Sequence, residues 1–394
     1  AVAGAAFPRP VEDNPRTNTP NDPDFDRCEP DDPDTPTGDC STYFEEQSGF
    51  FGFSPESANM VPAVPHSVGA TRYVNCDQLD GPGRAANLAS GDPECAQISG
   101  VRADSAWKYS TGDPETVIAI LDTGIDAAHR DLNYRAGKNC TGSGAPTDGN
   151  GHGTHVAGTA AAKDDGNDVV GVAPGARVWA VKVLNNKGSG TWSQVICGLD
   201  WVAQNATTGA TIEVANMSLG GGGSDSTCGG NDSLHNAICR VVNNAGVPIA
   251  VAAGNEGTNA ADSVPATYDE VITVSSLADL DGRPGALASN GCSDQDDTLS
   301  YFSNYGNDVD LIAPGSCIRS TRRGGGTTIM SGTSMATPHV AGAIADYMAR
   351  NGRTSPTAVK EALQDNGNLG WSGDRDSTRE KLLNLGFLGG RWTV

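Results

Sequence analysis

From about residue 98 onward, short runs of β-branched residues alternate with stretches whose apolar residues recur at helical spacing. Parallel strands need long crossover connections, usually helices, so this alternation is typical of a parallel sheet with helices on both faces. We therefore predict a three-layer α/β domain over 98–394 with a mainly parallel central sheet. The predicted strands are 116–121, 177–183, 213–217, 248–252 and 271–275, and the predicted helices are 154–162, 194–205, 232–244, 335–350 and one that begins at Pro356.

The N-terminal part has a different composition. Residues 1–40 are rich in acidic side chains and proline, and such a segment cannot bury enough apolar surface to offset the entropy lost on ordering. We predict an extended acidic arm here. The aromatic residues between Tyr43 and Phe53 are expected to dock on the main domain. The chain thus divides into an extension, 1–97, partly docked on a body formed by 98–394.

Charge limits the partners that this chain can have. It carries 48 acidic and 26 basic residues, a formal net charge of −22. Such a charge repels nucleic-acid phosphates and anionic membrane surfaces. In addition, no apolar run approaches the roughly 18 residues that a membrane-spanning helix needs. We expect neither nucleic acid nor membrane as a partner.

Ten cysteines are spread along the chain without a tight CxxC pattern. Disulfide bonds formed in an oxidising compartment explain this pattern better than zinc ligation does. The pairing cannot be read from sequence, although Cys228 with Cys239 and Cys28 with Cys40 would close short loops. We predict a disulfide-bonded, secreted protein.

Two segments place reactive side chains at the ends of regular elements. In 120–126, with the sequence ILDTGID, a buried strand ends in Asp122, and a buried carboxylate is costly unless something binds it. In 150–159, with the sequence NGHGTHVAGT, His152 and His155 open a helix rich in alanine and glycine. Such small residues suit close packing against a neighbouring element.

A third segment, 331–342, reads SGTSMATPHVAG and puts Ser331 and Ser334 just before a helix. A helix N-terminus offers unpaired N–H groups and a positive dipole end, which would stabilise a developing oxyanion. Each segment alone has a plain structural explanation, since a strand-end aspartate is often a turn residue and a serine before a helix is often its N-cap. The two histidines lack an HExxH pattern, and no strand precedes the glycines around His152 as a phosphate loop would require.

Together the three segments supply what acyl transfer needs, namely a nucleophile, a base and a carboxylate that orients the base. Residue types alone do not choose between His152 and His155, or between Ser331 and Ser334. The motifs, in the order Asp, His, Ser over about 98–365, resemble those of the subtilisin-like serine proteases. That resemblance implies a subtilisin-like fold, and it makes Asp122 the orienting acid, His152 the general base and Ser334 the nucleophile. Packing and hydrogen-bonding roles remain for Asp126, His155 and His339.

Two further segments resemble parts of the family's active site. Residues 251–257, VAAGNEG, resemble the oxyanion strand, which implies that the Asn255 amide and the Ser334 N–H stabilise the oxyanion. Residues 216–221 resemble the strand that captures substrate backbone by strand addition. The resemblance implies a primary pocket walled by Ser218, Leu219, Gly220, Ala252 and Gly254, with a floor near Asp262, Ser263 and Pro265.

The charge at Asp262 decides the expected side-chain preference. If Asp262 faces inward, basic substrate side chains are tolerated; if it faces outward, large apolar and aromatic ones are favoured.

The resemblance also implies structural calcium. Asp131 and the loop 163–169 could supply carboxylate, amide and carbonyl oxygens, which are the ligands that calcium prefers. The expected ligands are Asp131, Lys163, Asp165, Asn167 and Val169. Further acidic groups that could bind metal are the pair Asp279 and Asp281 and the cluster Asp294, Asp296 and Asp297.

These motifs lead us to expect a secreted, monomeric serine endopeptidase of broad specificity that hydrolyses polypeptides through an acyl-enzyme intermediate. The alternatives are a latent precursor held shut by 1–97 and a catalytically silent binding protein on the same fold. No member of the Asp, His, Ser set is missing, which favours the enzyme.

Overall fold

The structure is a computed structural model and describes residues 2–4, 101–103, 106, 112, 115–165, 168–207, 212–279 and 294–389. Of the predicted extension 1–97 it describes only 2–4. The docking of the aromatic segment 43–53 and the pairing of Cys28 with Cys40 lie outside the described residues, and the division at residue 97 stays a prediction.

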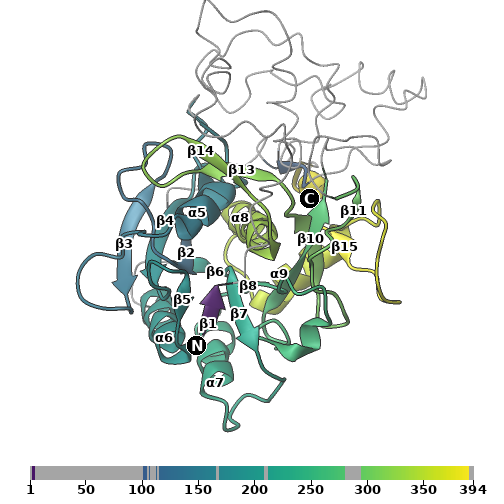
Figure 1. Ribbon diagram of the computed structural model, residues 1–394, viewed down its shortest axis with the longest axis horizontal. Coiled ribbons are helices and arrows are strands. Elements are labelled where there is room, and N and C mark those ends of the chain that lie inside the picture. The colour runs from purple at the N-terminus through teal and green to yellow at the C-terminus, as the bar shows by residue number, and fades with distance from the viewer. Residues whose placement is uncertain are drawn as a thin grey trace, which may run out of the picture.

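A nine-stranded sheet forms the centre of the domain (Figure 1). All neighbouring strands along its main path are parallel, and β11 (Thr298–Leu299) alone pairs antiparallel, with β10. The predicted mainly parallel sheet is therefore confirmed. In spatial order the path is β15 (Lys381–Leu382), β12 (Leu311–Pro314), β10 (Ile272–Ala278), β8 (Ile249–Ala252), β6 (Ile212–Met217), β2 (Val117–Asp122), β4 (Arg177–Lys182) and β3 (Tyr134–Asn139).

Helices cover both faces of the sheet, as the alternating pattern predicts. Within β2, Ile118 and Ile120 enter one core and Ala119 and Leu121 the other, because successive side chains point to opposite faces. The first core is closed by α5 (His152–Ala161), α8 (Thr333–Asn351) and α9 (Pro356–Asn366), and the second by α6 (Trp192–Thr207) and α7 (Ser233–Cys239).

The predicted elements are recovered with shifted boundaries. Helices α5 and α8 begin two residues earlier than predicted, so His152 and Ser334 lie inside first turns rather than before them. The predicted helix 232–244 is α7 followed by a wider π-helical segment, η4 (Arg240–Asn244). Ser355 caps α9 by accepting a hydrogen bond from the Ala358 N–H, as its sequence predicts.

Short or polar strands were not predicted. Strand β3 lies at the sheet edge with most of its residues partly or fully exposed, and β15 has two residues, so neither shows a hydrophobic run. A second sheet has the order β5 (Ser189–Gly190), β1 (Val2–Gly4), β7 (Leu219–Gly222) and β9 (Ser263–Val264). Figure 1 shows β1, in purple, beside β5 and β7. The third sheet is a hairpin of β13 (Ile318–Thr321) and β14 (Thr327–Met330), and short helical turns lie at η5 (Ala260–Asp262) and η6 (Leu385–Gly389).

Two disulfide bonds join described residues, Cys140–Cys197 and Cys228–Cys239. The second is a pairing that closes a short loop, which the sequence left open. Cys140 directly follows β3, and Cys197 lies in α6, so the first bond fastens the exposed edge of the sheet to a helix. Within the described ranges, no helix has the length and apolar character needed to cross a membrane.

Helix α5 packs closely against α8 and against strand β13, and a glycine lies at each contact. A Cβ atom on Gly342 in α8 would lie 2.8 Å from the Ala160 carbonyl oxygen of α5 and 2.7 Å from the Val172 Cβ. A Cβ atom on Gly158 in α5 would lie 2.5 Å from the Ser320 hydroxyl oxygen. The two helices that carry His152 and Ser334 are therefore held at a separation that only glycine permits.

Replacing Gly342 by alanine tests this contact. Alanine has the higher helix propensity by about 1 kcal/mol, so any loss of stability reports the steric conflict. We expect Gly342→Ala to lower the free energy of unfolding by about 1–3 kcal/mol, measured by urea denaturation. A variant as stable as the wild type, or more so, would contradict the packing described.

Candidate active site

The predicted site residues gather at the carboxyl edge of three adjacent parallel strands. Asp122 ends β2, Ser218 directly follows β6, and Asn255 lies three residues beyond β8. Strand β6 pairs with both β2 and β8, and neighbouring strands are about 4.8 Å apart, so these strand ends lie within roughly 10 Å of one another. Parallel sheets commonly bind ligands at this edge.

Asp122 and His152 form a buried hydrogen-bonded pair. The His152 Nδ1 atom lies 2.8 Å from Asp122 Oδ1 and 2.9 Å from Oδ2. Asp122 is 0% exposed and His152 3%, and the Thr123 N–H also donates to Asp122 Oδ1, at 2.6 Å. The carboxylate fixes Nδ1 as the donor nitrogen, which leaves the Nε2 lone pair for proton transfer.

The surroundings of His152 raise its pKa. Burial disfavours the charged imidazolium, but the charge and hydrogen bond of Asp122 together with the charge of Asp148 outweigh it, so the pKa of His152 lies above its ordinary value. A base with a raised pKa accepts a proton more readily.

Ser334 lies in the first turn of α8 and is 2% exposed. Its hydroxyl donates to the Ser218 carbonyl oxygen at 3.3 Å, and the Ser218 hydroxyl donates to the Ser334 carbonyl oxygen at 2.8 Å. This reciprocal pair fastens the start of α8 to the end of β6, between Asp122 on β2 and Asn255 beyond β8.

The Asn255 side chain is oriented by Thr333. Its Oδ1 atom accepts hydrogen bonds from the Thr333 N–H at 2.8 Å and the Thr333 hydroxyl at 2.9 Å. Because a backbone N–H can only donate, the oxygen must face Thr333, which turns the Nδ2 donor the other way. A Cβ atom on Gly332, two residues before Ser334, would lie 3.6 Å from that nitrogen.

The predicted substrate residues lie along β7 and the end of β8. Leu219 and Gly220 open β7, and β9 brings Ser263 opposite Gly222. Ala252 ends β8, and Gly254 follows it. Asp262 is exposed.

Strand β1 lies between β5 and β7, antiparallel to both. Ala3 pairs with Gly220 and Gly4 with Leu219, so β1 runs toward Ser218 and the Ser334 that it contacts. The edges of β5 and β7 are therefore separated by the width of one extended strand.

Sequence analysis missed Asp148, which is 3% exposed. Its carboxylate accepts hydrogen bonds from the N–H groups of Asn150 and Gly151, both at 2.8 Å, and from the Thr154 N–H at 3.0 Å. The hydroxyls of Thr123 and Thr154 also donate to it. Asp148 thus orders the start of α5, and its charge helps to raise the pKa of His152. The sequence signal for it is an acidic residue four positions before the histidine.

Asn304 is a second residue that was missed, and it is fully buried. Its Nδ2 donates to the Ala253 carbonyl oxygen at 3.0 Å and to the Ser263 hydroxyl at 3.3 Å. Its Oδ1 accepts from the N–H groups of Glu256 and Thr258. Asn304 therefore joins one predicted wall and the predicted floor of the primary pocket to the loop that carries Asn255.

The predicted calcium ligands are only partly described. Asp131 is fully buried, its Oδ2 accepts from the Val169 N–H at 3.2 Å, and its carbonyl accepts from the Lys163 N–H at 2.9 Å. Burial is the main cause that raises the pKa of Asp131 to about 7, and its Oδ1 has no protein hydrogen-bond partner. Asp165 is exposed, and Asn167 lies outside the described residues.

The other acidic groups are arranged differently from the prediction. Asp279, Asp296 and Asp297 are buried and bring carboxylate oxygens within 4.8 Å of one another, so they form one group that could bind a metal ion. Asp294 instead accepts hydrogen bonds from the Tyr301 N–H and the Ser316 hydroxyl. Asp281 lies outside the described residues.

The remaining motif residues have structural contacts. His155 Nε2 lies 2.9 Å from the Ile318 carbonyl oxygen, and His339 Nδ1 lies 2.9 Å from that of Met335. Burial lowers their pKa values to about 3 and about 4, respectively, so both rings are neutral at ordinary pH. Asp126 accepts hydrogen bonds from backbone N–H groups.

Comparison with known proteins identifies the class to which this site belongs. A model of the "Subtilase family" matches residues 113–384. A solved cold-adapted subtilisin-like serine proteinase superposes with a TM-score of 0.57 at 37% identity, covering 69% of this chain and 90% of that one. The chain therefore belongs to the subtilase family of serine proteases.

Individual relatives agree with this assignment. "Subtilisin-like protease 1" of Arthroderma otae is 43% identical over 71% of this chain and 52% of its own length. Proteinase T of Parengyodontium album is 38% identical over 75% of this chain and 95% of its own length. Subtilisin DY of Bacillus licheniformis is 37% identical over 68% and 90%. The chain spans about half the length of the fungal subtilisin-like protease 1 relatives that it matches.

Replacing Asp148 by asparagine tests its effect on His152. The amide loses the charge and one of the two acceptor oxygens, and hydrogen bonds to charged groups contribute about 1.5–3 kcal/mol each. We expect Asp148→Asn to lower the free energy of unfolding by about that amount. Because Asp148 helps to raise the pKa of His152, the acid limb of any His152-dependent activity should move to lower pH. An unmoved acid limb would mean that Asp148 acts on the fold alone.

Proposed function

We propose that this chain is a secreted serine endopeptidase that hydrolyses polypeptides through Asp122, His152 and Ser334. The buried Asp122–His152 pair carries the proposal. Burying one carboxylate against an imidazole costs more than packing apolar side chains would, so the pair has a chemical use. The disulfide bonds support secretion.

In the reaction, the Ser334 hydroxyl turns from the Ser218 carbonyl oxygen toward His152 Nε2. His152 accepts its proton while Ser334 Oγ attacks the substrate carbonyl carbon, and the resulting imidazolium is stabilised by Asp122. His152 then gives the proton to the leaving amine, which leaves an acyl-enzyme for water to hydrolyse. The Asn255 Nδ2 and the Ser334 N–H stabilise the oxyanion. In subtilisin, removal of one such donor lowers kcat by about 10² to 10³.

The substrate backbone binds as an extended strand between β5 and β7. Strand β1 supports this, because it pairs antiparallel with both and is directed toward Ser334. Main-chain hydrogen bonds then supply affinity regardless of sequence, which favours broad specificity. With Asp262 exposed and Ser218, Ala252 and Gly254 uncharged, the primary pocket favours large apolar and aromatic side chains.

Covalent labelling tests the proposed activity. We expect the wild type to hydrolyse casein and to be labelled by a fluorophosphonate on Ser334, whereas Ser334→Ala does neither. Ser331→Ala is the matched control and should retain both properties. Folded wild-type protein that neither hydrolyses casein nor takes the label would favour the catalytically silent alternative.

A latent form is the second candidate, and strand β1 favours it. A segment of the chain that lies between β5 and β7 competes with substrate for the same backbone groups. Proline at position 3 lacks the N–H that strand pairing uses. If β1 competes, Ala3→Pro should raise kcat/KM for a peptide substrate by about 2- to 10-fold, the worth of one hydrogen bond. The control is Thr17→Pro, outside the paired segment; equal rates for both variants would rule latency by β1 out.

We also propose that Asp131 helps to hold a structural calcium ion. Its fully buried Oδ1 without a protein partner fits a cation, which would neutralise the carboxylate and offset its burial. Carbonyl oxygens of the loop 163–169 are the expected neighbouring ligands. An ion that binds only the folded state adds about 2.7 kcal/mol to the free energy of unfolding when its concentration is 100 times its Kd.

Chelation tests the calcium site. At pH 8 we expect excess chelator to lower the melting temperature of the wild type. Without an ion, the pKa of Asp131 is about 7 in the folded chain and about 3.9 in the unfolded chain. The free energy of unfolding therefore falls as pH rises from about 3.9 toward 7. Asp131→Asn removes the carboxylate ligand, so its melting temperature should not respond to calcium. It also removes the cost of the buried charge, so it should melt no lower than the chelated wild type. A calcium response retained by Asp131→Asn would place the ion elsewhere.

A further inference from the structure

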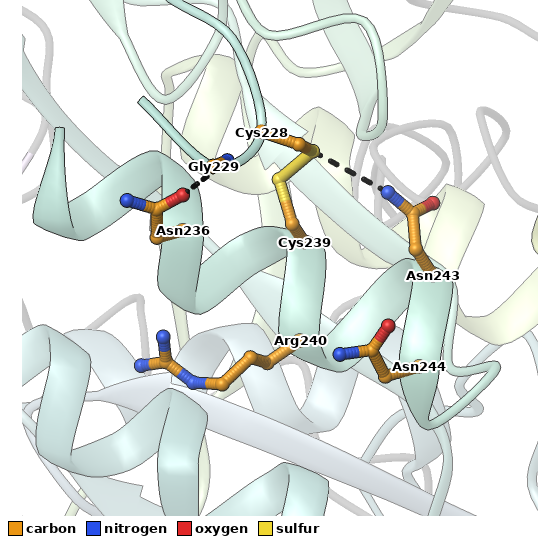
Figure 2. A pocket seen from close by; sticks show the side chains of 7 residues that line it. All are labelled: Cys228, Gly229, Asn236, Cys239, Arg240, Asn243 and Asn244. Carbon is orange, nitrogen blue, oxygen red and sulfur yellow. Dashed lines mark hydrogen bonds between the residues drawn. A yellow bond between two sulfur atoms is a disulfide. The ribbon is translucent and has the colours of Figure 1, made fainter. Parts of the chain in front are cut away.

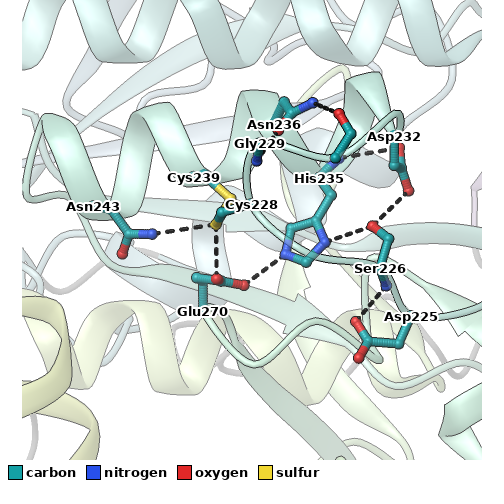
Figure 3. The surroundings of a disulfide bond; sticks show 11 residues. Asp225, Ser226, Cys228, Gly229, Asp232, His235, Asn236, Cys239, Asn243 and Glu270 are labelled. Atoms are coloured by element: carbon teal, nitrogen blue, oxygen red, sulfur yellow. Dashed lines mark hydrogen bonds and ion pairs between the residues drawn. A yellow bond between two sulfur atoms is a disulfide. The ribbon is translucent and has the colours of Figure 1, made fainter.

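A second group of metal-ligating side chains surrounds a disulfide bond far along the chain from Ser334. Ligand atoms of Cys228, His235, Cys239 and Glu270 all lie within 4.8 Å of one another, and the two cysteines are bonded to each other. Figure 3 shows His235 and Glu270 beside the disulfide. Thiolate, imidazole and carboxylate are the ligands that zinc takes in proteins.

The four side chains come from one helix, one loop and one segment that is distant in sequence. His235 and Cys239 lie four residues apart on α7, hence on one helix face, and are 2% and 8% exposed. Cys228 comes from the preceding loop, and Glu270 from the segment before β10. One helix, one loop and one distant segment thus contribute to a single set of four ligands.

A hydrogen-bond network orients His235 for ligation through Nε2. Its Nδ1 lies 2.7 Å from the Ser226 hydroxyl, which donates to Asp232 Oδ2. Ser226 and Asp232 therefore hold the ring from its Nδ1 side, and Nε2 faces Glu270. Asp232 is itself fixed as the N-cap of α7 and as acceptor of the Tyr268 hydroxyl. Outer contacts of this kind hold ligating histidines in place.

Glu270 contacts both His235 and Cys228. The His235 Nε2 atom lies 2.7 Å from Glu270 Oε2. The other carboxylate oxygen lies 2.9 Å from Cys228 Sγ. Two thiolates beside this carboxylate would gather negative charge, which a divalent cation offsets.

Cys228 is accessible to reductants. It is exposed and lines an open surface pocket with Asn236, Arg240 and Asn244 (Figure 2). Cys239 and Arg240 enter the same pocket from α7 and η4. An ion and a small dithiol can therefore both reach the disulfide from solvent.

We propose that reduction of Cys228–Cys239 turns this group into a zinc site. A dithiol reductant gives two electrons and two protons, the S–S bond breaks, two thiols form, and the reductant becomes a disulfide. Zn²⁺ then binds two thiolates, His235 Nε2 and the Glu270 carboxylate. The two thiol protons pass to solvent, and His235 binds as a neutral imidazole whose remaining proton is on Nδ1. The sulfur atoms separate to about 3.8 Å, the spacing of two thiolates around tetrahedral zinc.

Cobalt spectroscopy tests this proposal. The full chain carrying Ser334→Ala, which limits autolysis, is reduced by a dithiol and titrated with Co²⁺. We expect one Co²⁺ per chain, with a thiolate charge-transfer band and the visible bands of tetrahedral cobalt, all lost on adding Zn²⁺. The oxidised chain, the double variant C228S/C239S and His235→Ala should lack these bands. Asn244→Ala, which changes the pocket but no ligand, should keep them. A reduced chain that behaves like C228S/C239S would overturn the proposal.

A second variant avoids reductant altogether. Cys228→His cannot form the disulfide, yet it keeps four ligands, so it should bind one Zn²⁺ at least 10-fold more tightly than the double variant C228H/H235A. Binding is measured by competition with a chromophoric chelator, and folding by circular dichroism. Cys228→His that folds without binding zinc, or that stays unfolded in excess zinc, counts against the site.

Discussion

The Asp122 carboxylate can stay charged at the buried end of β2 only because other groups hold it there. Removing an ionised carboxylate from water costs several kcal/mol even after relaxation of the surroundings. The Thr123 N–H and the His152 imidazole offset that cost. In return, the carboxylate fixes the tautomer of His152 and raises its pKa. The proposed proton transfer therefore depends on this one interaction.

The rest of the scaffold packs the helix that carries Ser334, the proposed nucleophile, against the helix that carries His152. Asp148 orders the start of α5, and the glycine-lined contact brings α8 close to α5. The reciprocal bonds of Ser218 and Ser334 fix the start of α8 to β6. Thr333 binds the Asn255 Oδ1 atom, so the Nδ2 donor faces away from Thr333. The bonds of Asp148 are local, but the other contacts join segments that are distant in sequence, so the site forms only in the folded domain.

The sequence predicted the elements whose local pattern is strong. Strands such as β2 and β8 are fully buried and β-branched, and the motifs around Asp122, His152 and Ser334 are distinctive in sequence. Asp148 was missed because an aspartate in a polar, glycine-rich loop has the pattern of an ordinary turn residue. Asn304 was missed because its partners at 253, 256 and 258 are distant in sequence. The group around Cys228 was missed for the same reason: Glu270 is 42 residues away.

The central claim is that a charged, buried Asp122 raises the basicity of His152. Nuclear magnetic resonance of chain labelled with ¹⁵N at histidine measures it directly, by following the His152 ring nitrogens from pH 4 to pH 10. The account predicts a titration midpoint above the ordinary value of about 6.5, a proton on Nδ1 throughout, and a lower midpoint in Asp122→Asn. A midpoint at or below 6.5 that Asp122→Asn leaves unchanged would contradict it.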